Sequence, residues 1–262
     1  MTAIPGYDEF EFDLPEALLK RLIDALDDVL PTPLTAEALA HLPEVQGVYQ
    51  LFLKRGDDRL DRVYIGKTDS EAGLKKRLLK HARKVRHRVG LEPEAVYFKA
   101  LRVFVFTAVD LETQLIKHYG GVKAVEWNGS GFGANDPGRE RDTTKYKPKH
   151  FDAQFPIDID RPLDAEFPSE GSAAELLKAL KRAVPYLIRF ETISQHSRTA
   201  HADLESTRVA LSAADLQSPA TAIAGVIAKL PAGWHATMLP SHVIIYKNDD
   251  RKFPSGRRLA TS

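Results

Sequence analysis

Two segments decide the fold: Gly47-Val48-Tyr49-Gln50-Leu51-Phe52-Leu53 and Arg62-Val63-Tyr64-Ile65-Gly66, on either side of Gly56-Asp57. Both are rich in β-branched and aromatic residues, which is typical of strands, and the glycine between them is typical of a hairpin turn. A two-residue turn at Gly56-Asp57 would place Tyr49 opposite Tyr64, with both phenols on one face of the hairpin. A longer loop around Asp57-Asp58-Arg59 would shift this register. Two ordinary strand tyrosines are the simpler alternative, so a chemical role depends on the residues that follow.

Composition and charge limit the class of protein. At 262 residues the chain is long enough for one large domain or two small ones. Its formal net charge of +1 does not indicate general nucleic-acid binding, but the charges are unevenly distributed, because residues 75–88 carry eight cations and no acid. Cysteine is absent, which excludes disulfides and thiolate metal sites.

The sequence shows neither the layout of a signal peptide nor an apolar run of membrane-spanning length. We therefore expect a cytoplasmic protein without a membrane partner.

The order of the expected elements predicts an α+β fold in three regions. Residues 1–43 form a helical N-terminal arm, 44–157 form the core that contains the hairpin, and 158–262 form an α+β C-terminal region. We expect helices at 14–30, 36–42, 72–88, 111–119, 172–184, 200–211 and 220–230, strands at 101–109, 234–238 and 242–246, and an ordered loop at 127–151.

The basic helix at 72–88 has an apolar stripe, with Arg77 and His81 stacked along its edge. Lys84 and Arg88 extend the same row. A guanidinium and an imidazole at the border between core and solvent are suited to bind a phosphate. A solvated basic face is the alternative, although the absence of acids favours a polyanion surface.

Glu112 lies within the apolar arc of the next expected helix, which Asp110 caps. An ionised carboxylate in such a place costs several kcal/mol unless it is paired, hydrogen-bonded or metal-bound. Two other interpretations stay open: the first helical turn leaves Glu112 exposed, or backbone N–H groups bind it there.

A glycine-rich loop at 129–138 is followed by Arg139, Arg141, Lys145, Lys147 and Lys149. Such a loop can bring its backbone close to phosphates or into a groove. It matches neither the Walker A nor the dinucleotide-binding pattern. A flexible surface loop is the alternative.

Taken in order, these residues resemble the GIY-YIG nuclease superfamily. The first half-motif is Gly47-Val48-Tyr49 and the second is Tyr64-Ile65-Gly66, which continues into Lys67-Thr68. Arg77 and His81 match the Arg-x-x-x-His helix of the restriction-enzyme branch. Glu112 matches the metal-binding glutamate of the superfamily and Asn128 the asparagine that follows it. Within the superfamily, the loop at 131–138 is most similar to that of type II restriction endonucleases that cut CCGCGG, the SacII isoschizomers, and the resemblance covers roughly residues 44–152.

The resemblance implies a GIY-YIG fold, with a small three-stranded antiparallel sheet flanked by helices. It also implies hydrolysis of DNA phosphodiesters with one Mg²⁺ (or Mn²⁺) held by Glu112. Arg77 would then donate to the phosphate oxygens. We expect Tyr49 to activate water with His81 taking its proton, and Tyr64, Lys67 and Asn128 to position phosphate and water.

We therefore expect a bacterial type II restriction endonuclease that cuts double-stranded DNA at a GC-rich palindrome such as CCGCGG. It would act as a homodimer, and its genetic partner would be a cognate DNA methyltransferase. The C-terminal region would serve DNA binding or dimerisation. Another GIY-YIG nuclease of repair, mobile elements or phage defence, and a DNA-binding protein with an inactive core, are the alternatives. The expected DNA-binding residues are Lys67, Lys84, Arg88, Arg139, Arg141, Lys145 and Lys147.

Overall fold

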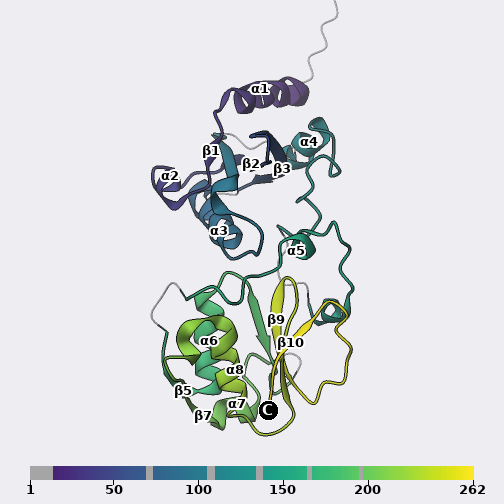
Figure 1. Cartoon of the computed structure of the whole chain (residues 1–262). Helices are drawn as coiled ribbons and strands as arrows, with labels where there is room; N and C mark the ends of the chain where they lie inside the picture. The colour runs from purple at the N-terminus through teal and green to yellow at the C-terminus, as the bar shows by residue number, and fades with distance from the viewer. Residues whose placement is uncertain (1–13, 69–72, 105–109, 134–137, 164–166, 195–196) are drawn as a thin grey trace, which may run out of the picture. The chain divides into compact units, whose positions relative to one another are not determined.

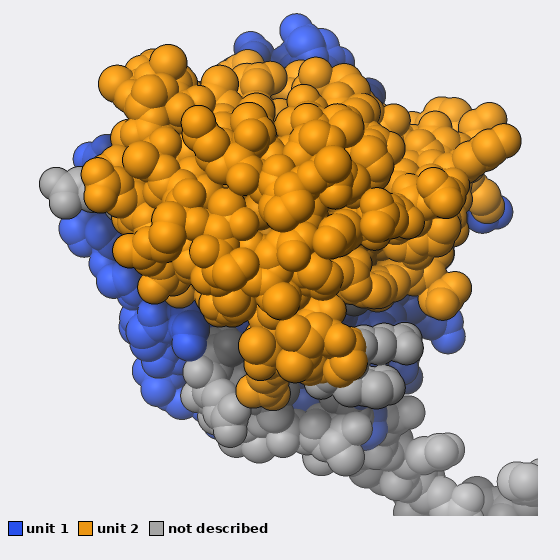
Figure 2. Space-filling model, turned by 90° about the horizontal axis from the view of Figure 1, so that it is seen from below, with its two compact units in different colours: residues 1–77, 96–125 blue, residues 78–95, 126–262 orange. Residues whose placement is uncertain are grey.

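The computed structural model describes residues 14–68, 73–104, 110–133, 138–163, 167–194 and 197–262 (Figure 1). The chain divides into two compact units, of which the first comprises residues 1–77 and 96–125, and the second comprises 78–95 and 126–262 (Figure 2). This division differs from the three expected regions, because the expected boundary at 157/158 falls inside the second unit. Contacts distant in sequence account for the difference, since Ile157 and Ile159 belong to the core of the C-terminal residues.

The first unit is built on a four-stranded sheet in the order β1-β4-β2-β3. The expected α+β class and antiparallel pairing are confirmed, but the sheet has a fourth strand, because Thr32-Pro33 pairs with Tyr97 and Phe98 at an edge where a proline is tolerated. Its elements are α1 (Leu14–Asp28), β1 (Thr32–Pro33), α2 (Ala36–Ala40), β2 (Gly47–Lys54), β3 (Leu60–Lys67), the first turn of α3 (Leu74–Arg86), β4 (Val96–Arg102) and α4 (Leu111–His118).

Strand β4 begins earlier than the expected strand at 101–109 and ends at Arg102. Residues 105–109 of that prediction lie outside the described residues. The other helices of this unit lie within two or three residues of their expected ends.

The register of the hairpin differs from the expected one. Tyr49 pairs with Gly66, and Tyr64 pairs with Leu51. The loop is the longer alternative, with a hydrogen bond of 2.8 Å from Arg55 N to Arg59 O and Asp58 at a φ of 62°. A β-bulge between Leu51 and Phe52 shifts the pairing by one further residue. The difference from the expected register amounts to two residues, an even shift, so the two phenols still share one face of the sheet.

The opposite face of this sheet is apolar. Val48 and Ile65 pack there against Leu22 and Leu26 of α1 and Leu115 of α4. Burial of this face fixes the register, because a shift by one residue would exchange the two faces.

The second unit contains the remainder of α3 and a four-stranded sheet in the order β10-β8-β9-β6, in which only the β6–β9 pair is parallel. The expected α+β character of the C-terminal region is confirmed. Its elements are η1 (Pro93–Ala95), η2 (Arg139–Thr143), α5 (Phe151–Gln154), β5 (Glu170–Ser172), α6 (Ala173–Ala183), β6 (Leu187–Phe190), α7 (Ala202–Ser206), β7 (Arg208–Ala210), η3 (Asp215–Gln217), α8 (Pro219–Ile227), β8 (Trp234–Met238), β9 (His242–Lys247) and β10 (Arg257–Thr261).

One face of this second sheet forms the core with α6 and α8 (Figure 1), where Ala236 of β8 and Ile245 of β9 pack against the helices. The other face carries Ile244 and Tyr246. The expected helix at 200–211 ends at Ser206 and is followed by β7, because Val209 is buried in pairing with Gly171.

None of the helices within the described ranges has the length and apolarity needed to span a membrane.

Candidate functional site

Two buried tyrosines lie side by side on β2 and β3 of the first sheet. The rings of Tyr49 and Tyr64 are 6.1 Å apart between centroids and tilted by 35°. The side chain of Tyr49 extends across Gly66, its partner on β3, so closely that a Cβ at position 66 would overlap the phenol. The glycine of the second half-motif is therefore required by the position of the first tyrosine.

Packing also requires a glycine at the start of the first half-motif, Gly47. A Cβ at Gly47 would overlap the carbonyl of Leu101 on β4 and the side chain of Leu74 on α3. Thr68 closes this end of the hairpin, because its Oγ1 accepts from Gly47 N at 2.9 Å and its own N–H donates to Gly47 O at 2.8 Å. Gly47 and Thr68 thus fix the ends of the two strands on which the tyrosines lie.

Arg77, at the end of the first turn of α3, lies against the two phenols. Its Nε donates to Tyr49 Oη at 3.3 Å. Burial alone would lower the pKa of Arg77, but hydrogen bonds to Tyr49 and Tyr64 raise it. The guanidinium is therefore held in its charged form beside the phenols.

The two phenols differ in their proton affinity. Burial, and next the neighbouring Tyr64, raise the pKa of Tyr49 far above its usual value, and its hydrogen bond to Tyr64 raises it further. Burial also raises the pKa of Tyr64, followed by the negative charge of Glu112, whereas the hydrogen bonds from Arg77 and Tyr49 lower it. Tyr49 is thus the inner phenol, fully buried, and Tyr64 is the phenol that senses Glu112.

Glu112 begins α4 and is half-buried, as its place in the apolar arc predicted. Burial raises the pKa of its carboxyl group; Lys67 opposes this shift, and Asp110 adds to it. The ammonium of Lys67 contacts Asp110 Oδ1 at 2.8 Å, and Thr113 Oγ1 donates to Asp110 Oδ2 at 2.6 Å. These two donors lower the pKa of Asp110 to about 2. Sequence analysis treated Asp110 only as a helix cap, because nothing local connects it to Lys67.

The first unit therefore brings together five of the predicted residues. They are Tyr49, Tyr64, Lys67, Arg77 and Glu112. The other two predicted catalytic residues belong to the second unit. There, His81 is buried and stacks on Phe132 with centroids 4.8 Å apart, and Asn128 is half-buried.

Besides Lys67, two further predicted DNA-binding cations have partners within the protein. Arg88 is buried and donates to Asp152 at 2.7 Å and to the carbonyls of Phe155 and Pro240. Lys84 donates to the carbonyl of Phe132 and lies 5.0 Å from the centre of its ring. These contacts favour a structural role: Lys84 of α3 binds the glycine-rich loop, and Arg88, which follows α3, binds Asp152, Phe155 and Pro240.

The basic segment that follows this loop, residues 139–149, is called the strap below. Arg139 pairs with Glu191 at 3.3 Å and lies over the ring of Tyr246, whereas Arg141, Lys145 and Lys147 are exposed. Residues 134–137 of the predicted loop lie outside the described residues.

A buried carboxylate that the sequence did not reveal anchors the strap. Asp142 is fully buried and accepts from Arg189 at 2.6 Å, His242 at 2.8 Å and Tyr246 at 2.9 Å. No sequence signal could have found it, because its partners lie 47 to 104 residues away along the chain.

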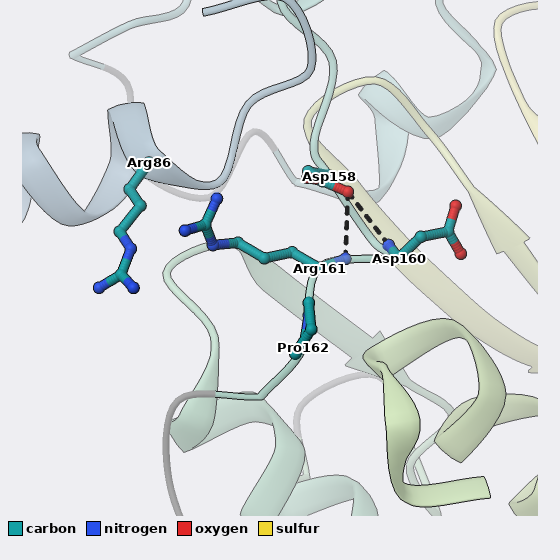
Figure 3. A pocket seen from close by; sticks show the side chains of 5 residues that line it. All are labelled: Arg86, Asp158, Asp160, Arg161 and Pro162. Carbon is teal, nitrogen blue, oxygen red and sulfur yellow. Dashed lines mark hydrogen bonds between the residues drawn. The ribbon is translucent and has the colours of Figure 1, made fainter. Parts of the chain in front are cut away.

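The second unit also has a pocket of about 560 Å³, lined by Arg86, Asp158, Asp160, Arg161 and Pro162 (Figure 3). Asp158 accepts from the backbone of Asp160 and Arg161, so its carboxylate holds the turn together. None of the predicted site residues lines this pocket.

Comparison with known protein families and with curated proteins gave no match to this sequence. Functional conclusions therefore depend on the geometry of the site.

Proposed function

We propose that this protein is a metal-dependent endonuclease of the GIY-YIG type that hydrolyses double-stranded DNA. The observation that carries the proposal is that two phenols on one small sheet lie beside a guanidinium from α3 and interact with a carboxylate from α4. The close approach of Tyr49 to Gly66 supports the proposal further. The resemblance depends on the tyrosine of the first half-motif and the glycine of the second, and the packing of one against the other explains why both are present.

The carboxylate ligands fit a hard divalent cation. The described residues hold no group of three or more acidic or histidine side chains that could bind a metal. The two carboxylates near the start of α4 are Asp110, which precedes the helix, and Glu112, which lies in its first turn. Such a set suits Mg²⁺ (or Mn²⁺), which is commonly held by one or two carboxylates with water and phosphate completing its shell. When bound, the ion supplies neutralisation of the scissile phosphate and stabilisation of the leaving 3′ oxygen.

Arg77 has the charge and position to bind the phosphate. Its pKa is raised, so the guanidinium stays charged, and it can offer further N–H groups to non-bridging oxygens as charge develops on them. Lys67, once released from Asp110, adds a second cation on the same side as Glu112.

The geometry favours Tyr64 over Tyr49 as the phenol that faces water. Tyr49 is fully buried and its pKa is raised further than that of Tyr64, so its phenolate forms less readily and is less available as a base. We propose that Tyr64 contacts the attacking water, and that Tyr49 with Arg77 supports the charge that forms on Tyr64. The two tyrosines thus exchange the roles that the sequence analysis gives them. The role of His81 as a proton acceptor stays a prediction.

We propose a restriction endonuclease for a GC-rich palindrome such as CCGCGG, acting as a homodimer with a cognate methyltransferase as genetic partner. One chain carries one Glu112, so a double-strand cut at a palindrome is most simply made by two copies related by two-fold symmetry.

Cleavage of plasmid DNA with Mg²⁺, followed by sequencing of the ends, tests the proposal. The control is Glu112→Gln, which preserves the size of the side chain. We expect discrete fragments that end in one palindrome, and no cutting by the variant. Scattered or structure-dependent cuts would instead favour a repair or mobile-element nuclease, and binding without cutting by the wild-type protein would favour an inactive core.

A further inference from the structure

Two basic segments that lie far apart in the sequence meet in the second unit. Residues 143–149 of the strap contain three lysines and no acid, and residues 251–258, called the tail below, contain four cations and no acid. Ser255 joins them, because its Oγ accepts from Tyr146 N at 3.0 Å and donates to Thr144 O at 3.3 Å. Ser255 thus binds Thr144 and Tyr146, the residues on either side of Lys145 in the sequence.

The strap is held rigidly where it meets the tail. Asp142 is bound by β6 and β9, as described above, and Tyr146 Oη shares a hydrogen bond of 2.8 Å with Ser241 Oγ. Ser241 Oγ in turn lies 2.7 Å from His242 Nδ1. A buried polar network whose members are all satisfied fixes a single conformation. The cations are thus presented on an ordered backbone.

Strap and tail lie on the face of the second sheet that its helices do not cover. For the strap, Asp142 contacts Tyr246, which lies on that face. For the tail, Arg258 pairs with Thr237 on β8, and Thr237 pairs with Ile244 on β9, which lies on the same face. The opposite face packs against α6 and α8. Arg258 therefore lies on the same side as the strap, whereas Arg257 pairs with Met238 on the helix-covered face.

Four cations of the strap and tail are not compensated by an ion pair. Lys145, Lys147, Lys252 and Arg258 are exposed, and among the described residues none of them has an acidic partner within ion-pair distance. Two other cations are neutralised, because Asp249 binds Arg251 of the tail at 2.6 Å and Glu191 binds Arg139 of the strap. Two nearby acids, Glu140 and Asp250, are exposed.

We infer that strap and tail together form a surface that binds the phosphate backbone of duplex DNA. The inference rests on the proposed function for the choice of DNA. It joins Lys145 and Lys147, which the sequence analysis expects to bind DNA, to Lys252 and Arg258 of the tail, which it does not name. Lysines and arginines spread over an exposed face suit a polymer of regularly spaced phosphates, to which each contact adds affinity by releasing counterions. The pocket of Figure 3 is less suited to an anion, because two carboxylates line it beside two guanidiniums.

The test is binding of the full-length protein to a fluorescent non-cognate duplex without divalent metal, followed by anisotropy over a range of salt. The variant is Lys252→Glu with Arg258→Glu. The matched control is Lys181→Glu with Arg182→Glu, which reverses two exposed charges on α6. If each residue contacts one phosphate, the slope of log K against log salt should fall by about 1.8 in the variant, and affinity at low salt should fall at least tenfold. The control should bind as the wild type does.

Equal binding by the variant and the control would overturn the inference. Neutralisation by Lys252→Gln with Arg258→Gln provides a second check, because it removes the same contacts without introducing repulsion and should lower the slope by the same amount. The proposed function is judged separately. A protein that binds through this surface but never cuts refutes the nuclease, and a protein that cuts while the variant binds normally refutes the surface.

Discussion

Gly66 and Tyr49 show how one residue can fix a site. The phenol occupies the space that a Cβ at position 66 would need. Gly66→Ala should therefore displace the Tyr49 ring, destabilise the protein by about 1–3 kcal/mol through overpacking, and slow cleavage about 100-fold, the scale of a small misplacement. Gly56→Ala is the matched control, since no atom lies within 4 Å of its added Cβ. Thermal unfolding and single-turnover cleavage measure both effects, and equal behaviour of the two variants would contradict the packing argument.

The raised pKa of Tyr49 makes stability depend on alkaline pH. An unfolded tyrosine loses its proton near pH ~10, whereas burial and Tyr64 keep Tyr49 protonated to higher pH in the folded protein. The stability that this group contributes is therefore fully present below about pH 10 and is lost as pH rises through the folded pKa. Between about pH 9 and 11, the urea midpoint of the wild type should fall more steeply than that of Tyr49→Phe. Parallel curves for the two proteins would mean that Tyr49 titrates normally.

Elements with strong local signals could be predicted from the sequence, and those set by distant contacts could not. The apolar stripes predicted α1, α3, α4, α6 and α8 to within a few residues, and the runs rich in β-branched and aromatic residues predicted β2, β3, β8 and β9. The register of the hairpin was missed because the bulge at Leu51 depends on how both faces are buried. In the candidate site, Tyr49, Tyr64, Arg77 and Glu112 were found through their order, whereas the pairing of Asp110 with Lys67 was not.

The contact between the residues that follow α3 and helix α5 depends on one buried ion pair. Arg88 and Asp152 are almost fully buried and lie 2.7 Å apart. Arg88→Met leaves the carboxylate unpaired and should cost about 3–5 kcal/mol, whereas Lys178→Met, which breaks an exposed pair with Glu205, should cost about 0–1 kcal/mol. Urea unfolding measures both. Replacing both partners, by Arg88→Met with Asp152→Leu, should recover much of the loss. An Arg88→Met cost as small as that of Lys178→Met would show that the pair does not hold this contact.

At the scale of the whole molecule, the sequence predicted an α+β chain but not its division. The expected core at 44–157 is split, because α3 beyond Arg77 and the residues from Glu126 onward group with the C-terminal region. Contacts such as Arg88 to Pro240, across 152 residues, produce this grouping and leave no local signal. The division assigns the phenols and Glu112 to one unit and the strap and tail to the other, which is the separation expected if one unit performs the chemistry and the other contributes affinity for DNA.

The central claim is that the site of the first unit adds water across a DNA phosphodiester. Its most direct test is cleavage of duplex DNA with Mg²⁺ in water enriched in ¹⁸O, with mass spectrometry of the ends. We expect 3′-hydroxyl ends and 5′-phosphates that each carry one ¹⁸O, and no product with Glu112→Gln. Ends without the label, a tyrosine joined covalently to DNA, or equal cutting by the Glu112 variant would contradict the account.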